Sequence, residues 1–253
     1  MRERLAIALL AGALVGCQRE QPVLLYHAVG CGTGDSYDVP VAQFRDELDA
    51  ALAAGFTFVP LSVLNPKGGS TAPLPAKPLG VSFDDGAQCL FSQAFPELLS
   101  RHVPFTLFLP ARWLDLPHVQ EVNASTHWAT LTVPQVREML DSNLVQIGAH
   151  GLTHVRLPAL DAAQARAEIA DSAILLGAWF GPRPLFFAYP FGAFGSREVA
   201  LVKEAGYAGA FAVGVGTGGR YAYRRRSIHA GLAREAFLQQ LDSRWVFPLV
   251  SHP

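Results

Sequence analysis

Short apolar runs alternate with helical segments along most of this chain, and this alternation restricts the fold more than any other feature. The apolar runs predict buried strands, because they are bounded by Gly, Pro or polar residues. These runs cover residues 23–29, 57–60, 79–83, 105–109, 144–148, 185–189, 209–213 and 225–229. Segments with helical spacing lie at 41–54, 91–101, 133–141, 161–179, 196–205 and 234–241. Strands separated by helices form mostly parallel sheets, and about seven such units predict an α/β barrel with its chemistry at the carboxyl ends of the strands.

Composition excludes two broad classes of protein. The chain has 253 residues, of which 50% are hydrophobic and 16% charged, so it can bury a sizeable core and is not disordered. Lys plus Arg is 20 and Asp plus Glu is 21, which gives a net charge of -1. This balance argues against a protein that binds nucleic acid through phosphate attraction.

The amino terminus has the pattern of an exported bacterial lipoprotein. Arg2 and Arg4 precede an apolar run over residues 5–15, which is too short to span a bilayer comfortably. The run ends in Leu-Val-Gly-Cys, which resembles a lipobox whose cysteine, Cys17, is acylated and becomes the mature amino terminus. An ordinary signal peptide with an incidental cysteine is the alternative, but the small residue before Cys17 favours the lipoprotein.

A lipobox also predicts domain boundaries and location. The lipid would hold the protein at a membrane. Gln18, where an aspartate would retain the protein at the inner membrane, implies by resemblance to Gram-negative lipoproteins an outer-membrane location facing the periplasm of the bacterial cell envelope. The predicted organisation is a signal peptide at 1–16, a lipidated tether at 17–22 and one domain at 23–253.

Two cysteines remain in this predicted oxidising compartment, Cys31 and Cys89. Both follow strands that we expect to be neighbours, so our hypothesis is that they form a disulfide. Two unpaired thiols are an equally good interpretation of the sequence.

The first polar cluster is Asp84-Asp85-Gly86, directly after the predicted strand 79–83. Two adjacent carboxylates repel each other, so both stay ionised only with a positive charge between them, and a divalent cation is the simplest source. Taken alone, the pattern is better explained as a turn with an Asp cap.

The second cluster is His150 and His154, after the predicted strand 144–148. In one helical turn, their side chains would lie about 5–6 Å apart and could share a metal ion. Two imidazoles and one carboxylate leave a position open for water, as catalytic zinc requires. An Asp pair at one strand end and a His pair at another are together much harder to dismiss than either pair alone.

Three motifs together resemble those of the polysaccharide deacetylases, the NodB-type domains of carbohydrate esterase family 4. They are Ser-Phe-Asp-Asp-Gly at 82–86, His-x-x-x-His at 150–154 and Tyr-Pro-Phe-Gly at 189–192, and the resemblance extends over about residues 23–230. The family fold is a distorted (β/α)7 barrel, which agrees with the strand count. Leu-Tyr-His-Ala-Val at 25–29 looks like the branch that acts on exopolysaccharide or cell-wall N-acetylglucosamine.

The resemblance implies roles for five residues. Asp85, His150 and His154 would bind one divalent metal ion, with zinc the first choice, and Asp84 would be the general base. The backbone N–H of Phe191 would help to hold the oxyanion.

The sequence departs from the family pattern in two places. His229 is the candidate general acid, but it stands in Ser-Ile-His where the family has Leu-x-His. The family's arginine in the third motif, which orients the base, is absent, and Ala188 or Tyr189 stands there. Arg225 or Arg226 could replace it from the neighbouring strand.

Four residues are candidates for contact with substrate. Tyr189 and Pro190 belong to the third motif, and Trp128 in a polar loop could stack on a sugar ring. His27 ends the first strand and could line the pocket, although a buried partner of the backbone is an equally good interpretation.

The predicted activity is that of a hydrolase of carbon–nitrogen bonds other than peptide bonds. It would remove N-acetyl groups from an N-acetylglucosamine polysaccharide and release acetate, with the metal polarising the acetamide and activating water. Two alternatives remain: O-deacetylation of an acetylated polysaccharide, and a non-catalytic lipoprotein that binds glycan. The complete Asp-Asp-His-His set argues against the second.

Overall fold

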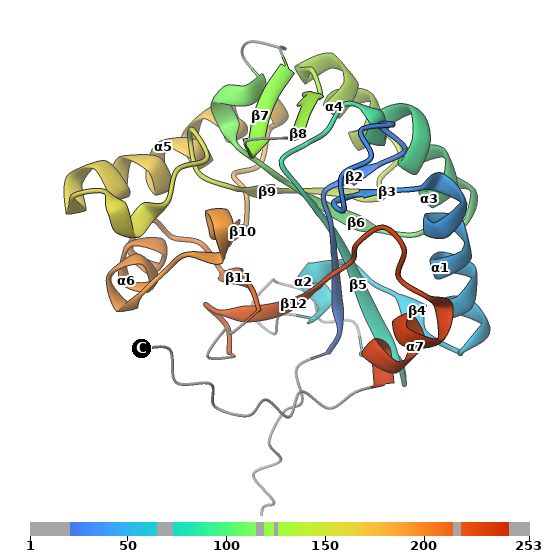
Figure 1. Cartoon of the computed structure of the whole chain (residues 1–253). Coiled ribbons are helices and arrows are strands. Elements are labelled where there is room, and N and C mark those ends of the chain that lie inside the picture. Colours follow the sequence, from blue (N-terminus) through green and yellow to red (C-terminus); the bar gives the residue numbers. More distant parts are fainter. Residues whose placement is uncertain (1–20, 65–72, 115–118, 124–125, 215–218, 243–253) are drawn as a thin grey trace, which may run out of the picture.

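A closed ring of seven parallel strands forms the centre of the molecule (Figure 1). The computed structural model describes residues 21–64, 73–114, 119–123, 126–214 and 219–242. In order around the ring, the strands are β1 (Val23–Tyr26), β12 (Tyr223–Ser227), β11 (Gly209–Val213), β10 (Phe186–Ala188), β9 (Val145–Ala149), β6 (Phe105–Leu109) and β5 (Pro78–Asp84). The ring closes because β5 also pairs with β1, and the short β4 (Thr57–Phe58) pairs only with the beginning of β5. The predicted α/β fold, a (β/α)7 barrel, is confirmed.

Helices surround this ring (Figure 1). The outer helices are α1 (Val41–Ala53), α3 (Phe95–Ser100), α4 (Val133–Leu140), α5 (Ala162–Phe180), α6 (Ser196–Glu204) and α7 (Arg234–Asp242). The short α2 (Leu61–Leu64) instead covers the amino-terminal end of the barrel, where Gly80 makes room for it. A Cβ at Gly80 would lie 2.5 Å from a methyl group of Leu61. The opposite end, where the strands finish, therefore remains for the functional site.

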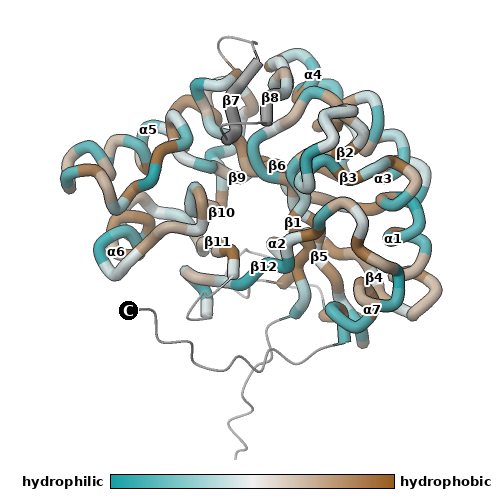
Figure 2. The backbone as a smooth tube through the Cα atoms, viewed as in Figure 1, coloured by the Kyte–Doolittle hydropathy of each residue, from teal (hydrophilic) through white to brown (hydrophobic). Residues whose placement is uncertain are grey.

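The two faces of each strand have different environments, because side chains alternate along a strand. On β5, Leu79, Val81 and Phe83 pack in the core between strands and outer helices. Ser82 and Asp84 lie on the other face, inside the barrel, where both meet Arg225 of β12. Figure 2 shows hydrophilic β12 beside predominantly hydrophobic strands. A buried strand that carries charged side chains indicates a functional requirement rather than a packing one.

Two features of the strands differ from the prediction. The first predicted strand divides at His27 into β1 and β2 (Ala28–Val29), and β2 pairs with β3 (Asp38–Val39). An antiparallel hairpin of β7 (Val119–Asn123) and β8 (Thr126–Ala129) was not predicted.

Four single-turn helices complete the described chain: η1 (Leu90–Ala94), η2 (Ala111–Leu114), η3 (Leu157–Ala159) and η4 (Pro190–Gly192). Cys31 and Cys89 form a disulfide, with Cα atoms 5.2 Å apart, which confirms our hypothesis and its reason, since β1 and β5 are neighbours.

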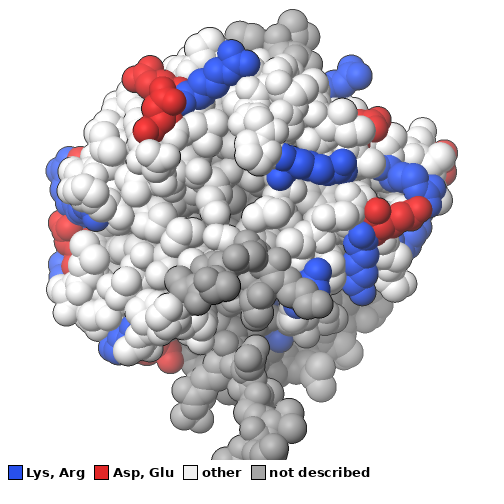
Figure 3. All heavy atoms as spheres, turned by 180° about the vertical axis from the view of Figure 1, so that it is seen from behind, with Lys and Arg blue, Asp and Glu red and all other residues white. Residues whose placement is uncertain are grey.

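The predicted lipobox and Cys17 lie outside the described residues. Within the described ranges, no helix is long and apolar enough to cross a membrane. On the face seen in Figure 3, acidic and basic side chains are intermixed, without a broad patch of one sign.

Candidate active site

Polar side chains from β5 and β9 meet at the carboxyl end of the barrel. Asp84 is the last residue of β5, and His150 follows the last residue of β9. His150 Nε2 lies 3.6 Å from an oxygen of Asp84 and 3.6 Å from Oδ1 of Asp85, and His154 Nε2 lies 3.2 Å from the same Asp85 oxygen. The ligand atoms of Asp85, His150 and His154 all lie within 4.8 Å of one another. The sequence thus identified a cluster whose members are far apart along the chain.

A left-handed turn lets both aspartates face the same space. Side chains of adjacent strand residues point to opposite faces. Asp85, however, has φ 69°, and Gly86 after it also has φ 69°. Asp tolerates this region better than most residues, and a Cβ at Gly86 would approach the side chain of Leu109 to 2.6 Å. The Asp-Asp-Gly motif therefore has a conformational reason as well as a chemical one.

The His pair is brought together by a loop, and the expected helical turn is wrong. Residues 150–154 are not helical, and Gly151 and His154 have φ 79° and 61°. The imidazole centroids nevertheless lie 4.9 Å apart. The four-residue spacing therefore predicted correctly that the two imidazoles lie close together, but the reason is a loop with positive φ angles and not a helical turn.

Glu168 of α5 holds this loop, which the sequence did not indicate. Its Oε2 accepts the backbone N–H groups of Leu152 and Thr153, each at 2.9 Å, and its Oε1 accepts the Thr153 hydroxyl at 2.6 Å. These bonds pair two backbone N–H groups that lie outside regular secondary structure. An acidic residue on the inner face of α5 was the only signal available.

The triad fits a divalent cation. Oδ1 of Asp85 is buried and accepts no hydrogen bond within the described structure, although both imidazoles face it. Burial lowers the pKa of both histidines, that of His154 to about 4, so both are neutral ligands near pH 7. His150 Nδ1 lies 2.8 Å from the carbonyl oxygen of Ala188, which makes Nδ1 the donor and leaves the Nε2 lone pair for a metal.

The charge balance leads to the same conclusion. Burial raises the pKa of Asp85, although His27 and His150 oppose that effect. Arg225 can neutralise only one of two buried carboxylates, so one negative charge needs a further cation. A divalent ion bound by Asp85, His150 and His154 would supply it.

Arg225 forms a bidentate ion pair with the carboxylate of Asp84. Its Nη1 and Nη2 donate to Oδ1 at 2.6 Å and to Oδ2 at 2.7 Å, and both side chains are buried. Burial alone would raise the pKa of Asp84, but Arg225 and His150 lower it to about 2. Of the two candidate replacements for the family's arginine, the structure brings Arg225 to the carboxylate, while Arg226 belongs to the opposite face of β12.

His229, the predicted general acid, and His27, predicted to line the pocket, differ in position. His27 is half-buried, its buried Nδ1 has no hydrogen-bond partner within the described structure, and it interacts electrostatically with Asp85 and Asp84. Burial lowers its pKa. His229 lies beyond β12, because the last strand ends at Ser227 and not at His229 as predicted, and its ring packs on Tyr37. Tyr37 in turn packs on His27, with centroids 4.7 Å apart.

The fold and this cluster agree with a family assignment. The sequence model of the polysaccharide deacetylase family matches residues 71–210, which is more than half of the chain. The chain belongs to the polysaccharide deacetylase family. No curated protein matches it significantly.

Solved structures share the deacetylase fold at low sequence identity. The Streptococcus pyogenes deacetylase PplD, solved with acetate, is 19% identical, with a TM-score of 0.73 over 88% of this chain and 98% of that one. IcaB from Ammonifex degensii is 21% identical, with a TM-score of 0.71 over 88% and 96% of the two chains. A de-N-acetylase from Aggregatibacter actinomycetemcomitans is 23% identical, with a TM-score of 0.68 over 82% and 94%.

Aromatic side chains surround His154 in this deacetylase. Trp113 packs against it with centroids 4.9 Å apart, and Phe191 does so at 4.6 Å. The Arg156 guanidinium lies 4.7 Å from the Phe191 ring centroid on this partly open side, where Phe191 is 47% exposed. Phe191 has φ 58° within the turn η4, so the Pro-Phe-Gly segment forms a sharp turn beside the cluster.

Three predicted substrate contacts need correction. Tyr189 is fully buried, because it shares the outer face of β10 with Phe187, and its hydroxyl donates to the carbonyl of Tyr221. Pro190 is also buried, beside Gly151. Trp128 is only 3% exposed and lies on β8, not in an open polar loop. Tyr189 and Pro190 support the turn, and Trp113 is the tryptophan that contacts the metal triad.

Proposed function

We propose that this deacetylase removes N-acetyl groups from a polysaccharide that contains N-acetylglucosamine, and does so with one divalent metal ion, zinc by preference. The observation that carries this proposal is the position of the Asp84 carboxylate. It is held by two hydrogen bonds from Arg225 and lies 3.6 Å from Nε2 of His150. Beside it, Oδ1 of Asp85 accepts no hydrogen bond within the described structure. The similar fold of a de-N-acetylase from Aggregatibacter actinomycetemcomitans supports N- over O-deacetylation.

Each residue of the cluster has a distinct task in this proposal. A divalent cation held by Asp85, His150 and His154 would polarise the acetyl carbonyl and lower the pKa of a water molecule. Asp84 is ionised at neutral pH and oriented by Arg225, so it can accept the proton of the attacking water. The η4 turn places Phe191 against His154, which supports a role for its backbone N–H in holding the oxyanion.

The leaving amine needs a proton, and this separates amide from ester hydrolysis. An amine leaves poorly as an anion, whereas an alcohol leaves more readily, so an N-deacetylase depends more on a general acid. Two histidines could donate: His229, as the family resemblance implies, and His27. We favour His27, because it interacts electrostatically with both aspartates and its Nδ1 is unpaired within the described structure.

We also propose that residues 1–16 are a lipoprotein signal peptide, that Cys17 is acylated and that residues 17–22 tether the domain 23–253 to the bacterial outer membrane, facing the periplasm. The lipobox-like sequence and the polar residue at position 18 support this proposal. A polysaccharide in the cell envelope would then be within reach of the catalytic domain.

The test is acetate release from N-acetylglucosamine oligomers, compared with release from O-acetylated xylan oligomers. We expect release from the N-acetylated oligomers, its loss after treatment with a chelator, and its return with zinc. Faster acetate release from the O-acetylated oligomers would show that the protein is an esterase and would contradict the proposed N-deacetylase activity. No release from either would leave a protein that binds glycan without turnover.

A further inference from the structure

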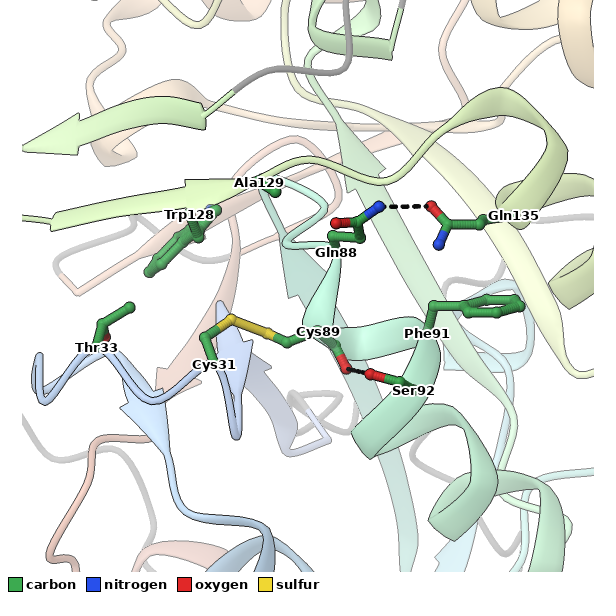
Figure 4. Close-up of a pocket in the computed structure, with 9 residues that line it drawn as sticks. All are labelled: Cys31, Thr33, Gln88, Cys89, Phe91, Ser92, Trp128, Ala129 and Gln135. Carbon is green, nitrogen blue, oxygen red and sulfur yellow. Dashed lines mark hydrogen bonds between the residues drawn. A yellow bond between two sulfur atoms is a disulfide. The ribbon is translucent and has the colours of Figure 1, made fainter.

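A hollow lies beside the Asp84-Asp85-Gly86 turn and is lined by none of the residues discussed as catalytic. Its volume is about 430 Å³, within the range of small-molecule sites, which is roughly 300–1,000 Å³. The disulfide Cys31–Cys89 forms part of its wall, with the indole of Trp128 to one side and the ring of Phe91 to the other (Figure 4). The side-chain amides of Gln88 and Gln135 face each other above the disulfide, 3.5 Å apart.

The lining combines polar and apolar groups and contains no charged side chain. Its nine residues offer two amides, two hydroxyl groups, two aromatic rings and the disulfide, and none is Asp, Glu, Lys, Arg or His. A charged ligand would lose its hydration there without gaining an ion pair. A neutral ligand that has both apolar faces and hydrogen-bonding groups suits this lining.

The pocket is joined directly to the catalytic turn. The N–H of Gln88, three residues beyond Asp85, donates to the carbonyl of Ala129 at 2.7 Å, and both residues line the pocket. The next residue, Thr130, donates to the carbonyl of Trp113, which packs on His154. One chain segment therefore borders the pocket with Trp128 and supports the wall of the metal cluster with Thr130.

We infer that this pocket is an accessory subsite for a neutral sugar ring of the polymer, distinct from the unit whose acetyl group is removed. The inference rests on the proposed function, because only a polymer can occupy both places at once. One face of the pyranose would pack on the ring of Phe91, and its hydroxyl or acetamido groups would bond to the side-chain amide of Gln88. A deacetylated unit carries an ammonium group, so the uncharged lining would favour stretches that still carry their acetyl groups.

The test compares Gln88→Leu with Gln93→Leu in the zinc-loaded full chain. Gln88 is half-buried in the pocket, whereas Gln93 is exposed on the neighbouring turn and does not line it. The probes are the β-1,4- and β-1,6-linked pentamers of N-acetylglucosamine, with 4-nitrophenyl acetate as an acetyl ester too small to reach both places. Loss of one neutral hydrogen bond corresponds to about a fivefold effect. We therefore expect Gln88→Leu to raise KM for a pentamer about fivefold with little change in kcat, and to lower the pentamer-to-ester ratio of kcat/KM by the same factor, while Gln93→Leu leaves that ratio as in the wild type.

A binding measurement separates this inference from the proposed function. In an Asp84→Asn background, calorimetry with the same pentamers should give a Kd about fivefold higher when Gln88→Leu is added. If acetate is released but Gln88→Leu changes neither the ratio nor the Kd, the subsite is wrong and the deacetylase stands. If no acetate is released but Gln88→Leu weakens pentamer binding, the subsite stands and the deacetylase is wrong. If the pentamers are neither bound nor hydrolysed, both are wrong.

Discussion

At the scale of single residues, Asp84 and Arg225 show what a sequence motif leaves out. The motif predicted Asp84 as the base, but not the partner that holds its carboxylate, because Arg225 lies 141 positions later in the sequence. Three arginines follow one another at 224–226, and only strand register decides which of them faces the barrel interior. Register depends on the whole sheet and cannot be obtained from a local pattern.

The two histidines can be separated by matched substitutions. We expect His27→Gln to lower kcat on an N-acetylated oligomer by roughly 100-fold or more, the usual contribution of a general acid. His229→Gln should lower it less than tenfold, because His229 lies behind Tyr37. Steady-state kinetics with the zinc content of each variant would check this, and a larger loss for His229→Gln would restore His229 as the acid.

Glu47 of α1 predicts a pH dependence of stability that is independent of catalysis. Burial raises its pKa to about 7, even though hydrogen bonds from Gln43 and Tyr26 oppose the shift. The folded state therefore holds a proton that the unfolded state releases near the ordinary pKa of 4.5. Its contribution to stability is complete below about pH 4.5 and is lost as the pH rises towards 7.

Glu47→Gln should remove this dependence. Between about pH 5 and pH 8, the wild type should lose up to roughly 3 kcal/mol more unfolding free energy than the variant. Urea unfolding of both proteins at the two pH values measures the difference. Parallel pH profiles for the two proteins would show that Glu47 titrates normally.

At the scale of elements, the sequence predicted most strands and helices but missed how the loops are built. Central strands have continuous apolar runs, and such runs are readable without tertiary information. The hairpin β7–β8 has a polar sequence, and the loop 150–154 takes its shape from Glu168 on α5 and from positive φ angles. These loops depend on contacts distant in sequence, so their proximity to the site could be predicted but not their conformation.

Glu168→Gln tests whether α5 positions the histidine loop. The variant keeps the size of the side chain but cannot accept all three hydrogen bonds. We expect zinc affinity to fall by roughly 10–100-fold, as is typical when a group supporting metal ligands is removed. Competition with a chelating dye measures the affinity. The control is Glu204→Gln, which changes an exposed carboxylate on α6, and equal affinities for the two variants would exclude a positioning role.

At the scale of the whole molecule, closure of the barrel creates the site. Asp84 and His150 lie at the ends of strands β5 and β9, which are both neighbours of β6, and β12 brings Arg225 across the interior. The strand count predicted this closure, and the motifs predicted which end would carry the chemistry. The proposed location in the cell is a separate matter, because that proposal rests on Cys17, which lies outside the described residues.

Replacement of Cys17 tests the anchor directly. When the full chain is expressed in a Gram-negative bacterium, Cys17→Ser should prevent incorporation of labelled fatty acid and shift the protein from the membrane fraction to the soluble fraction. Activity on soluble oligomers should be retained, because the domain at 23–253 holds all the proposed catalytic residues. Fatty-acid labelling of Cys17→Ser at the wild-type level would contradict the lipobox.

The central claim is that Asp85, His150 and His154 share one metal ion while Asp84 acts beside it. The most direct measurement is the zinc content of purified wild type, Asp84→Asn and His154→Gln, taken together with their release of acetate from N-acetylglucosamine oligomers. The account predicts about one zinc per chain in the wild type and in Asp84→Asn, with turnover at least 100-fold lower in Asp84→Asn, and little zinc in His154→Gln. Full zinc occupancy in His154→Gln, or loss of zinc from Asp84→Asn as complete as from His154→Gln, would contradict it.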